Sequence, residues 1–355
     1  MTVEENWMKL RHDNLNDFLS GLREKAKLII PRKKEGDWKW ETYQGSDVVR
    51  DFPPSLIDES VKKFFFPKRR PIGEFETDEE WSLSPVDRPE EKRIIMGIHP
   101  CDMAGIEYMD QVFLESDKKD ELYAAERDRT VLIGMYCDEM EENCHCTDRN
   151  ITPQTSESMD IVFTTTEDGY LLNSISEEGK EVLESVSMYL NKTDEKPEEE
   201  EWPEGKYEVA PPEELLNSYN DEIWEEFADI CLTCGACTFA CPTCTCFLVT
   251  DEKHDGEGER VTVWDSCQFS SYSKMSSGHN PREMNSDRIR NRVLDKFAYS
   301  YERHGEISCT GCGRCVNVCP LDRSFPQIAS TISEKIMNSK NSASQELSKG
   351  GINYS

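Results

Sequence analysis

Two stretches in the C-terminal half of the chain repeat one cysteine pattern: Cys231-Leu-Thr-Cys234-Gly-Ala-Cys237-Thr-Phe-Ala-Cys241-Pro242 and Cys309-Thr-Gly-Cys312-Gly-Arg-Cys315-Val-Asn-Val-Cys319-Pro320. Each copy reads C-x2-C-x2-C-x3-C-P, the run that bacterial 4Fe-4S proteins use, and two copies are much harder to attribute to chance than one. Three thiolates on a tight loop can reach three irons of one cubane, and the glycines between them let the backbone come close. The pattern therefore predicts two 4Fe-4S clusters.

In proteins with two such clusters, the fourth cysteine of each run binds the cluster of the other run. This rule predicts the ligands of a first cluster: Cys231, Cys234, Cys237 and Cys319. It also predicts the ligands of a second cluster: Cys309, Cys312, Cys315 and Cys241. The long interval between the two runs favours a helical two-cluster domain over a small β-containing ferredoxin. Two zinc sites are the alternative, but zinc fingers do not normally use four cysteines in this run with a trailing proline.

The N-terminal half contains four more cysteines that could form a metal site of their own: Cys101, Cys137, Cys144 and Cys146. We predict these as ligands of a third 4Fe-4S cluster. A zinc site and inert buried cysteines are alternatives that the residues leave open. His145 lies between two of these cysteines, and we expect it to tune a neighbouring ligand rather than bind metal itself. No ligand role is assigned to the remaining cysteines, for which packing is the simplest interpretation: Cys244, Cys246 and Cys267.

The cysteine content also bears on the compartment, because the 355-residue chain has 15 cysteines. The sequence has no apolar signal-peptide core and no run approaching the roughly 18–20 apolar residues of a membrane span. We therefore expect a cytoplasmic protein, in which metal binding or redox chemistry is favoured over a disulfide framework. The formal net charge of -30 argues against a nucleic-acid partner, because such a partner requires a basic surface. Nucleotide-binding signatures of the G-x-G-x-x-G and G-x4-G-K-[ST] types are absent.

The expected fold class is α+β and multidomain, with an N-terminal α/β domain over residues 1–190 and the α-helical two-cluster ferredoxin domain over residues 212–337. In the first domain, a helix at residues 16–22 precedes short apolar strands at residues 26–31, 93–98, 130–135 and 160–163. The first of these strands is expected to stop at Pro31. The alternation of strands with helical spacers is typical of an α/β domain.

Three further segments complete the predicted organisation. Residues 191–211 combine an acidic run with prolines, and like charges favour an extended linker. Residues 286–301 predict a helix with Ile289, Val293 and Phe297 on one face, which we expect to pack against the clusters. The tail at residues 338–355 has no periodic apolar pattern and is expected to be flexible.

Several short segments, in the same order along the chain, resemble the iron-sulfur β subunit of cytoplasmic sulfhydrogenases and the related iron-sulfur subunit of anaerobic sulfite reductases. Besides the cluster motifs, they are Phe64-Phe65-Phe66-Pro67-Lys68-Arg69, Gly97-Ile98-His99-Pro100-Cys101-Asp102, Cys144-His145-Cys146-Thr147, Asp160-Ile161-Val162-Phe163-Thr164, Trp264-Asp265-Ser266-Cys267 and Gly278-His279-Asn280-Pro281-Arg282. The most specific part runs from Trp264 to Arg282, because the cluster motifs alone occur in many ferredoxin-like chains. His145 departs from the family pattern, which usually has an aromatic residue there.

The resemblance implies a subunit that passes electrons between a flavin-containing, pyridine-nucleotide-binding partner and a catalytic partner. The catalytic partner would be a nickel-iron hydrogenase or a sirohaem sulfite reductase, and the chain itself would be non-catalytic. Two alternatives stay open. The chain could be the electron-transfer subunit of a methanogen-type heterodisulfide or formate-linked reductase complex. Alternatively, it could bind flavin or substrate in its own N-terminal domain.

Overall fold

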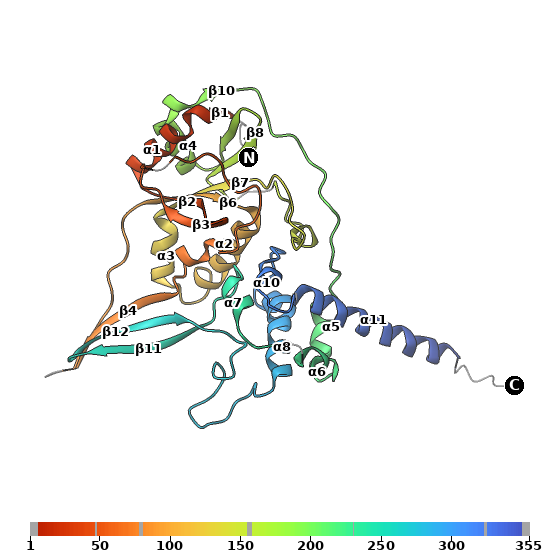
Figure 1. Ribbon diagram of the computed structural model, residues 1–355. Helices are drawn as coiled ribbons and strands as arrows, with labels where there is room; N and C mark the ends of the chain where they lie inside the picture. The colour runs from red at the N-terminus through yellow and green to blue at the C-terminus, as the bar shows by residue number, and fades with distance from the viewer. Residues whose placement is uncertain are drawn as a thin grey trace.

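The computed structural model describes residues 6–46, 48–77, 81–154, 158–229, 231–322 and 325–349, with the backbone alone at residue 254 and residues 339–349. Its N-terminal part is built on a large mixed sheet, and its C-terminal part is a group of helices around the two cysteine runs (Figure 1). A smaller sheet lies beside both parts. The predicted fold class, an N-terminal α/β domain followed by a helical region that contains the two cysteine runs, is confirmed.

The large sheet has eight strands in the order β10-β1-β9-β8-β7-β6-β2-β3. Their bounds are β1 Met8–Arg11, β2 Lys27–Lys34, β3 Asp37–Thr42, β6 Arg93–Ile98, β7 Thr130–Met135, β8 Ile161–Thr166, β9 Gly169–Ser174 and β10 Asn191–Lys192. The four central strands β2, β6, β7 and β8 are parallel, and the flanking strands pair antiparallel. The parallel strands correspond to the four apolar runs that the sequence predicts, because strands covered on both faces are apolar throughout.

Helices cover both faces of this sheet. Helices α1 (Leu15–Lys25) and α4 (Glu177–Ser185) contribute to one apolar core, which contains Phe18 and Leu183. Helices α2 (Pro100–Phe113) and α3 (Glu121–Asp128) contribute to the other core, which contains Ile106. The N-terminus of α2 therefore places Cys101 at the carboxyl end of β6.

The prediction that the first apolar strand stops at Pro31 is wrong. Strand β2 continues through Pro31, which is opposite Trp40 of β3. Strand β6 pairs with β2 only over Lys27–Ile29, so Pro31 lies beyond that parallel ladder. A residue without an N–H is tolerated there because no ladder hydrogen bond to β6 is lost.

A four-stranded antiparallel sheet joins the two halves of the chain, in the order β11-β12-β4-β5. It combines β4 (Arg69–Glu76) and β5 (Ser82–Ser84) with β11 (Phe247–His254) and β12 (Glu257–Trp264). Strand β12 pairs with β4 across almost two hundred positions of sequence. This hairpin inside the helical domain was not predicted from the sequence.

The remaining helices surround the two cysteine runs. They are α5 Pro212–Asn217, α6 Ile223–Ala228, α7 Ala236–Ala240, α8 Asn285–Leu294, a π-helical turn Asp295–Tyr299, α9 Ser300–His304, α10 Arg314–Asn317 and α11 Phe325–Lys349. As predicted, Ile289, Val293 and Phe297 are buried on one face of the α8–α9 segment. They belong to an apolar core against which Cys231 and Cys309 pack.

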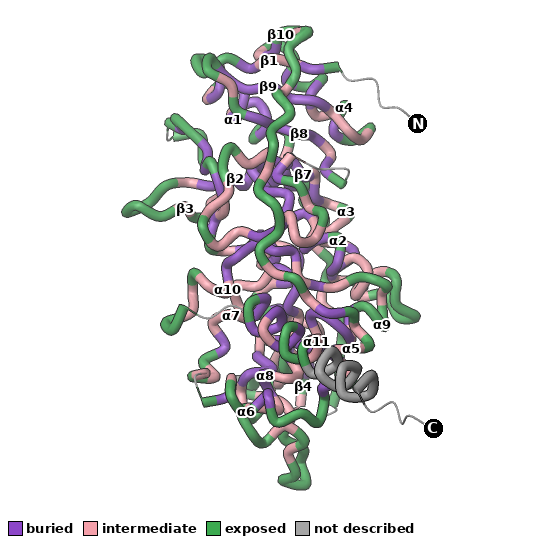
Figure 2. The backbone as a smooth tube through the Cα atoms, turned by 90° about the vertical axis from the view of Figure 1, so that its right-hand side faces the viewer, coloured by how far each residue is buried: buried purple, intermediate pink, exposed green. Residues whose placement is uncertain are grey.

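Residues 193–211 form no helix or strand and run mostly exposed along one side of the molecule (Figures 1 and 2). The backbone of helix α11 continues to Lys349, so the tail that is expected to be flexible from residue 338 begins within this helix. No proline or glycine interrupts residues 338–349, so nothing in their composition ends the helix. Residues 350–355 lie outside the described part of the chain. Among the described residues, no helix combines the length and the apolarity that a bilayer crossing requires.

Candidate iron-sulfur sites

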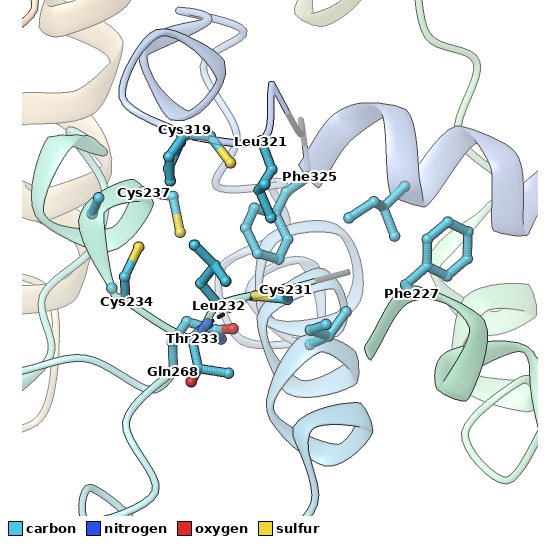
Figure 3. A pocket seen from close by; sticks show the side chains of 15 residues that line it. Phe227, Cys231, Leu232, Thr233, Cys234, Cys237, Gln268, Cys319, Leu321 and Phe325 are labelled. Carbon is cyan, nitrogen blue, oxygen red and sulfur yellow. Dashed lines mark hydrogen bonds between the residues drawn. The ribbon is translucent and has the colours of Figure 1, made fainter. Parts of the chain in front are cut away.

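The first predicted ligand set borders a single cavity. Cys231 and Cys234 come from the segment that leads into α7, Cys237 lies in the first turn of α7, and Cys319 follows α10. The space between them is about 60 Å³, and most of its other walls are apolar side chains such as Leu232. Figure 3 shows the four cysteines around this space. The fold thus brings the last cysteine of the second run to the first three cysteines of the first run.

The size of this cavity fits a polynuclear group better than a single ion. Within the described part of the chain, no three Cys, His, Asp or Glu side chains are placed to bind one metal ion between them. A water molecule occupies about 10–15 Å³ on the same measure, so the space of about 60 Å³ is several times larger. Four thiolates around a space of this size are the donor set of a 4Fe-4S cluster.

The backbone of the first run is shaped by residues with positive φ. Thr233 has φ 51° and Gly235 has φ 75°, and the backbone N–H of Thr233 donates to the sulfur of Cys231 over 3.4 Å. A Cβ atom at Gly235 would lie 2.8 Å from the ring of Phe269. Glycine is therefore required both for the left-handed turn and for the close approach, and α7 starts directly after it.

The second predicted ligand set is also gathered in space. The ionisation of Cys315 is influenced by the thiols of Cys312, Cys309 and Cys241. The four side chains are therefore close enough to interact electrostatically. Cys309 receives a further contact from His145, whose Nε2 lies 3.9 Å from its sulfur. Burial opposes ionisation of Cys309, but the contact with His145 brings its pKa below the ordinary value. His145 is thus a neighbour of a predicted ligand, and that ligand belongs to the second set.

The predicted third set borders a smaller cavity, of about 20 Å³. The cysteines at this cavity include the whole predicted set and one member of the second set: Cys101, Cys137, Cys144, Cys146 and Cys312. Burial raises the pKa of the four N-terminal thiols, that of Cys146 to about 11. Since metals bind thiolates, loading this site would release protons. The space corresponds to one or two waters, so a cubane here would require the loop of Cys144 and Cys146 to open.

The second and third sets are held together by a buried ion pair. Arg314, which lies between two cysteines of the second run, contacts Asp102, the neighbour of Cys101, with Nη2 2.5 Å from Oδ2 and Nη1 3.0 Å from Oδ1. Both side chains are at most 1% exposed, and Ser60 also donates to Asp102. A buried bidentate pair of this kind fixes geometry even where its net stabilisation is small.

Three buried cations lie close to the end of the first cysteine run and to Cys244: Lys62, Arg292 and Lys296. Arg292 donates to the sulfur of Cys244 over 2.7 Å and to the carbonyl of Cys237 over 3.1 Å. Lys296 lies in the π-helical turn and donates to the hydroxyl of Thr243 over 2.6 Å. The largest favourable charge interactions of all three cations are with cysteine sulfurs.

Buried cations require a counter-charge, and the pKa of Cys241, beside Lys296 and Arg292, lies below the ordinary value of a thiol. These cations were not predicted from the sequence. For Arg292 and Lys296 a signal was present, because Arg288, Arg292 and Lys296 recur at helical spacing, each directly before one of the apolar residues Ile289, Val293 and Phe297.

The three cysteines without a predicted role also meet in space. Cys244, Cys246 and Cys267 border one cavity of about 460 Å³, together with Tyr272 and Arg292. Cys246 is partly exposed, while the other two cysteines are buried. Packing alone does not describe this arrangement, because the cavity is wide enough to admit a small molecule.

Similarity to known proteins agrees with this geometry. Residues 230–323 match the family described as "4Fe-4S dicluster domain", a range that contains both cysteine runs. The chain is also 28% identical over 326 residues to the sulfhydrogenase 2 subunit beta of Pyrococcus furiosus, an alignment that covers 88% of this chain and 94% of that protein. The resemblance predicted from the sequence is therefore confirmed: over most of its length this chain is similar to a sulfhydrogenase beta subunit, and it contains a 4Fe-4S dicluster domain.

Proposed function

We propose that this chain is the electron-transfer subunit of an oxidoreductase complex and relays electrons between a flavoprotein that binds a pyridine nucleotide and a catalytic hydrogenase subunit. The observation that carries the proposal is the cavity of four cysteines drawn from both runs, together with the similarity to a sulfhydrogenase beta subunit over nearly the whole of that protein. When bound, 4Fe-4S clusters accept and donate single electrons.

The arrangement of the three cysteine sets supports a relay. Cys237 of the first set is electrostatically coupled to Cys241 of the second, and Cys312 of the second set is coupled to Cys101 of the third. The sets therefore follow one another through the protein. We propose the crossed ligand assignment for the first two sets and a 4Fe-4S cluster at the third.

The first set also has an exposed side. Cys234 is exposed, and the neighbouring apolar side chain of Leu232 is 61% exposed. Leu321, next to Pro320 of the second run, is 39% exposed. We propose that this apolar rim contacts a partner subunit, because electron transfer requires a short path between redox centres and exposed apolar residues beside a functional site mark interaction surfaces.

A redox titration of the isolated chain tests the proposal. Prepared anaerobically without partners, the chain should be reduced by dithionite and reoxidised by one-electron dyes, should retain no flavin, and should not turn over hydrogen or pyridine nucleotide. Flavin retained by the isolated chain would instead favour a binding site in the N-terminal domain. Turnover by the chain alone would contradict the proposal.

The type of catalytic partner is tested separately on the complex isolated from cells. Nickel in that complex is the expected result, because the similar protein is named as a hydrogenase subunit. Sirohaem without nickel would indicate a sulfite reductase instead. A complex with neither nickel nor sirohaem would contradict both of these partners and leave the heterodisulfide or formate-linked alternative. A cytoplasmic location, expected from the sequence, is part of the same proposal.

A further inference from the structure

The cavity bordered by Cys244, Cys246 and Cys267 contains a pair of cysteines in direct contact. Cys246 and Cys267 border this cavity together with Tyr272, and the largest influence on the ionisation of each of the two thiols is the other one. The pair is positioned by the end of the β11–β12 hairpin, where the backbone N–H of Asp265 donates to the carbonyl of Cys246 over 3.0 Å. Two sulfurs from different segments are thus held together at a cavity wall.

The two cysteines differ in exposure, because Cys246 is partly exposed and Cys267 is buried, and the pKa values of their thiols differ in the same sense. The hydrogen bond from Cys267, with help from Tyr272 and against the effect of burial, lowers the pKa of Cys246 to about 6. The same contact, together with burial, raises the pKa of the Cys267 thiol. A partly exposed thiolate beside a protonated thiol is the arrangement of a nucleophilic cysteine with a resolving partner.

The cavity is also electropositive, although the chain as a whole has a formal charge of -30. Arg282, Arg292 and Arg303 border it, and Asp295 is the acidic residue among its lining side chains. Arg303 pairs with that aspartate over 2.7 Å. A concave site with an excess of guanidinium groups attracts anions and holds them near its reactive atoms.

We propose that Cys246 and Cys267 form a redox-active dithiol that reduces small anionic disulfides bound in this cavity. The Cys246 thiolate attacks one sulfur of the bound disulfide, whose S–S bond breaks, and one thiolate leaves with the bonding electron pair. The Cys267 thiol then loses its proton and attacks Cys246, which releases the second thiolate and forms a Cys246–Cys267 disulfide. In total, the substrate gains two electrons and the cysteine pair loses two.

The oxidised pair needs two electrons and two protons to return to the dithiol. This part rests on the proposed function, because the electrons would come from the iron-sulfur relay. Cys244 lies between the pair and the second ligand set, since it lines the same cavity and is hydrogen bonded to Cys241. The exchange itself needs no relay and can be tested without it.

The test uses the full-length chain, prepared anaerobically with its metal content intact and reduced, and two chromogenic disulfides. One is the dianion 5,5′-dithiobis(2-nitrobenzoate), and the other is the neutral 2,2′-dithiodipyridine. With the dianion at a stoichiometric amount, a fast phase should release two coloured thiolates per chain, because both halves of the reagent leave. The rate of the fast phase with each reagent is divided by the rate at which that reagent reacts with a small free thiol. This ratio should be several-fold higher for the dianion than for the neutral reagent.

Single variants assign the two roles. Cys246→Ser should remove the fast phase while the iron content stays unchanged. Cys267→Ser should release one coloured thiolate and leave the other half of the reagent on Cys246, where mass spectrometry detects it. Arg282→Gln should slow the reaction with the dianion several-fold and leave the neutral reagent unaffected. Arg260→Gln is the matched control, because Arg260 is an exposed arginine of β12, and it should change neither rate.

Three results would overturn the proposal. They are a fast phase that survives Cys246→Ser, equal relative rates for the two reagents, and a loss of iron in Cys246→Ser. The last result would make Cys246 a metal ligand. None of these results depends on partner subunits or on turnover of the complex. The proposal of thiol–disulfide exchange can therefore be refuted while the proposed electron relay is supported, and the relay can be refuted while the exchange is supported.

Discussion

Removing the buried charge of Lys296 should lower the reduction potential of the cluster that Cys241 is predicted to bind. The ammonium group of Lys296 lies 2.6 Å from the hydroxyl of Thr243, and that hydroxyl lies 3.3 Å from the sulfur of Cys241. The charge is therefore at most about 6 Å from this sulfur. Lys296 is 3% exposed, so solvent screens it little. A nearby cation stabilises the reduced cluster, which is the more negative state.

The size of the effect follows from Coulomb's law. At about 6 Å and an effective dielectric constant of about 20, the interaction of one added electron with this charge is about 2.8 kcal/mol. For a one-electron couple, 59 mV corresponds to a tenfold change, or about 1.4 kcal/mol. The potential should therefore fall by about 120 mV in Lys296→Met. Because the added electron is spread over the whole cluster, this value is the upper end of the expected shift.

The assay is a redox titration followed by electron paramagnetic resonance. Lys274→Met serves as the control because Lys274 is exposed and its removal changes the net charge by the same amount. Thermal unfolding of each variant shows whether the fold is retained. A shift in Lys296→Met no larger than that of the control, in a folded protein with full iron content, would refute the reasoning.

Three further predictions concern the ligand sets and their connection. Cys241→Ser should perturb the cluster of Cys309, Cys312 and Cys315 in spectroscopy and leave that of Cys231 largely intact, and the opposite outcome would refute the crossed assignment. Cys144→Ala combined with Cys146→Ala should remove about four irons per chain. An unchanged iron content would show that the N-terminal cysteines do not bind a cluster and serve only in packing. Asp102→Asn should lower stability by about 3–5 kcal/mol because it leaves Arg314 buried and unpaired. The exposed pair of Arg260 and Asp251 offers the matched control, because Asp251→Asn removes a solvent-screened carboxylate and should cost little stability. An equal loss in both variants would count against a stabilising role of the buried pair of Asp102 and Arg314.

Much of the candidate site could be predicted because cysteine spacing is a local signal with a direct chemical reason. The same rule that assigns the fourth cysteine to the other cluster anticipated Cys319 beside Cys231, Cys234 and Cys237. The apolar strands at the centre of the sheet could also be predicted, because strands buried on both faces are apolar throughout and lack the alternation of apolar and polar residues. These features depend on a few neighbouring residues each.

The missed features depend on long-range packing. Strand β12 reads as a polar segment, with Glu257, Glu259 and Arg260, and its partner β4 lies in the other half of the chain. Lys62 reaches the carbonyl of Cys244 over 2.9 Å, although nothing in its local sequence indicates burial. The pairing of Cys246 with Cys267 likewise arises only once the β11–β12 hairpin has formed.

The most direct test of the central claim is iron, acid-labile sulfide and zinc analysis of the anaerobically purified chain. Two clusters in the dicluster domain predict about eight irons and eight sulfides per chain, and a third cluster raises both numbers to about twelve. Stoichiometric zinc without acid-labile sulfide would contradict the account, because the same thiolates would then hold structural metal and no electron could pass through them.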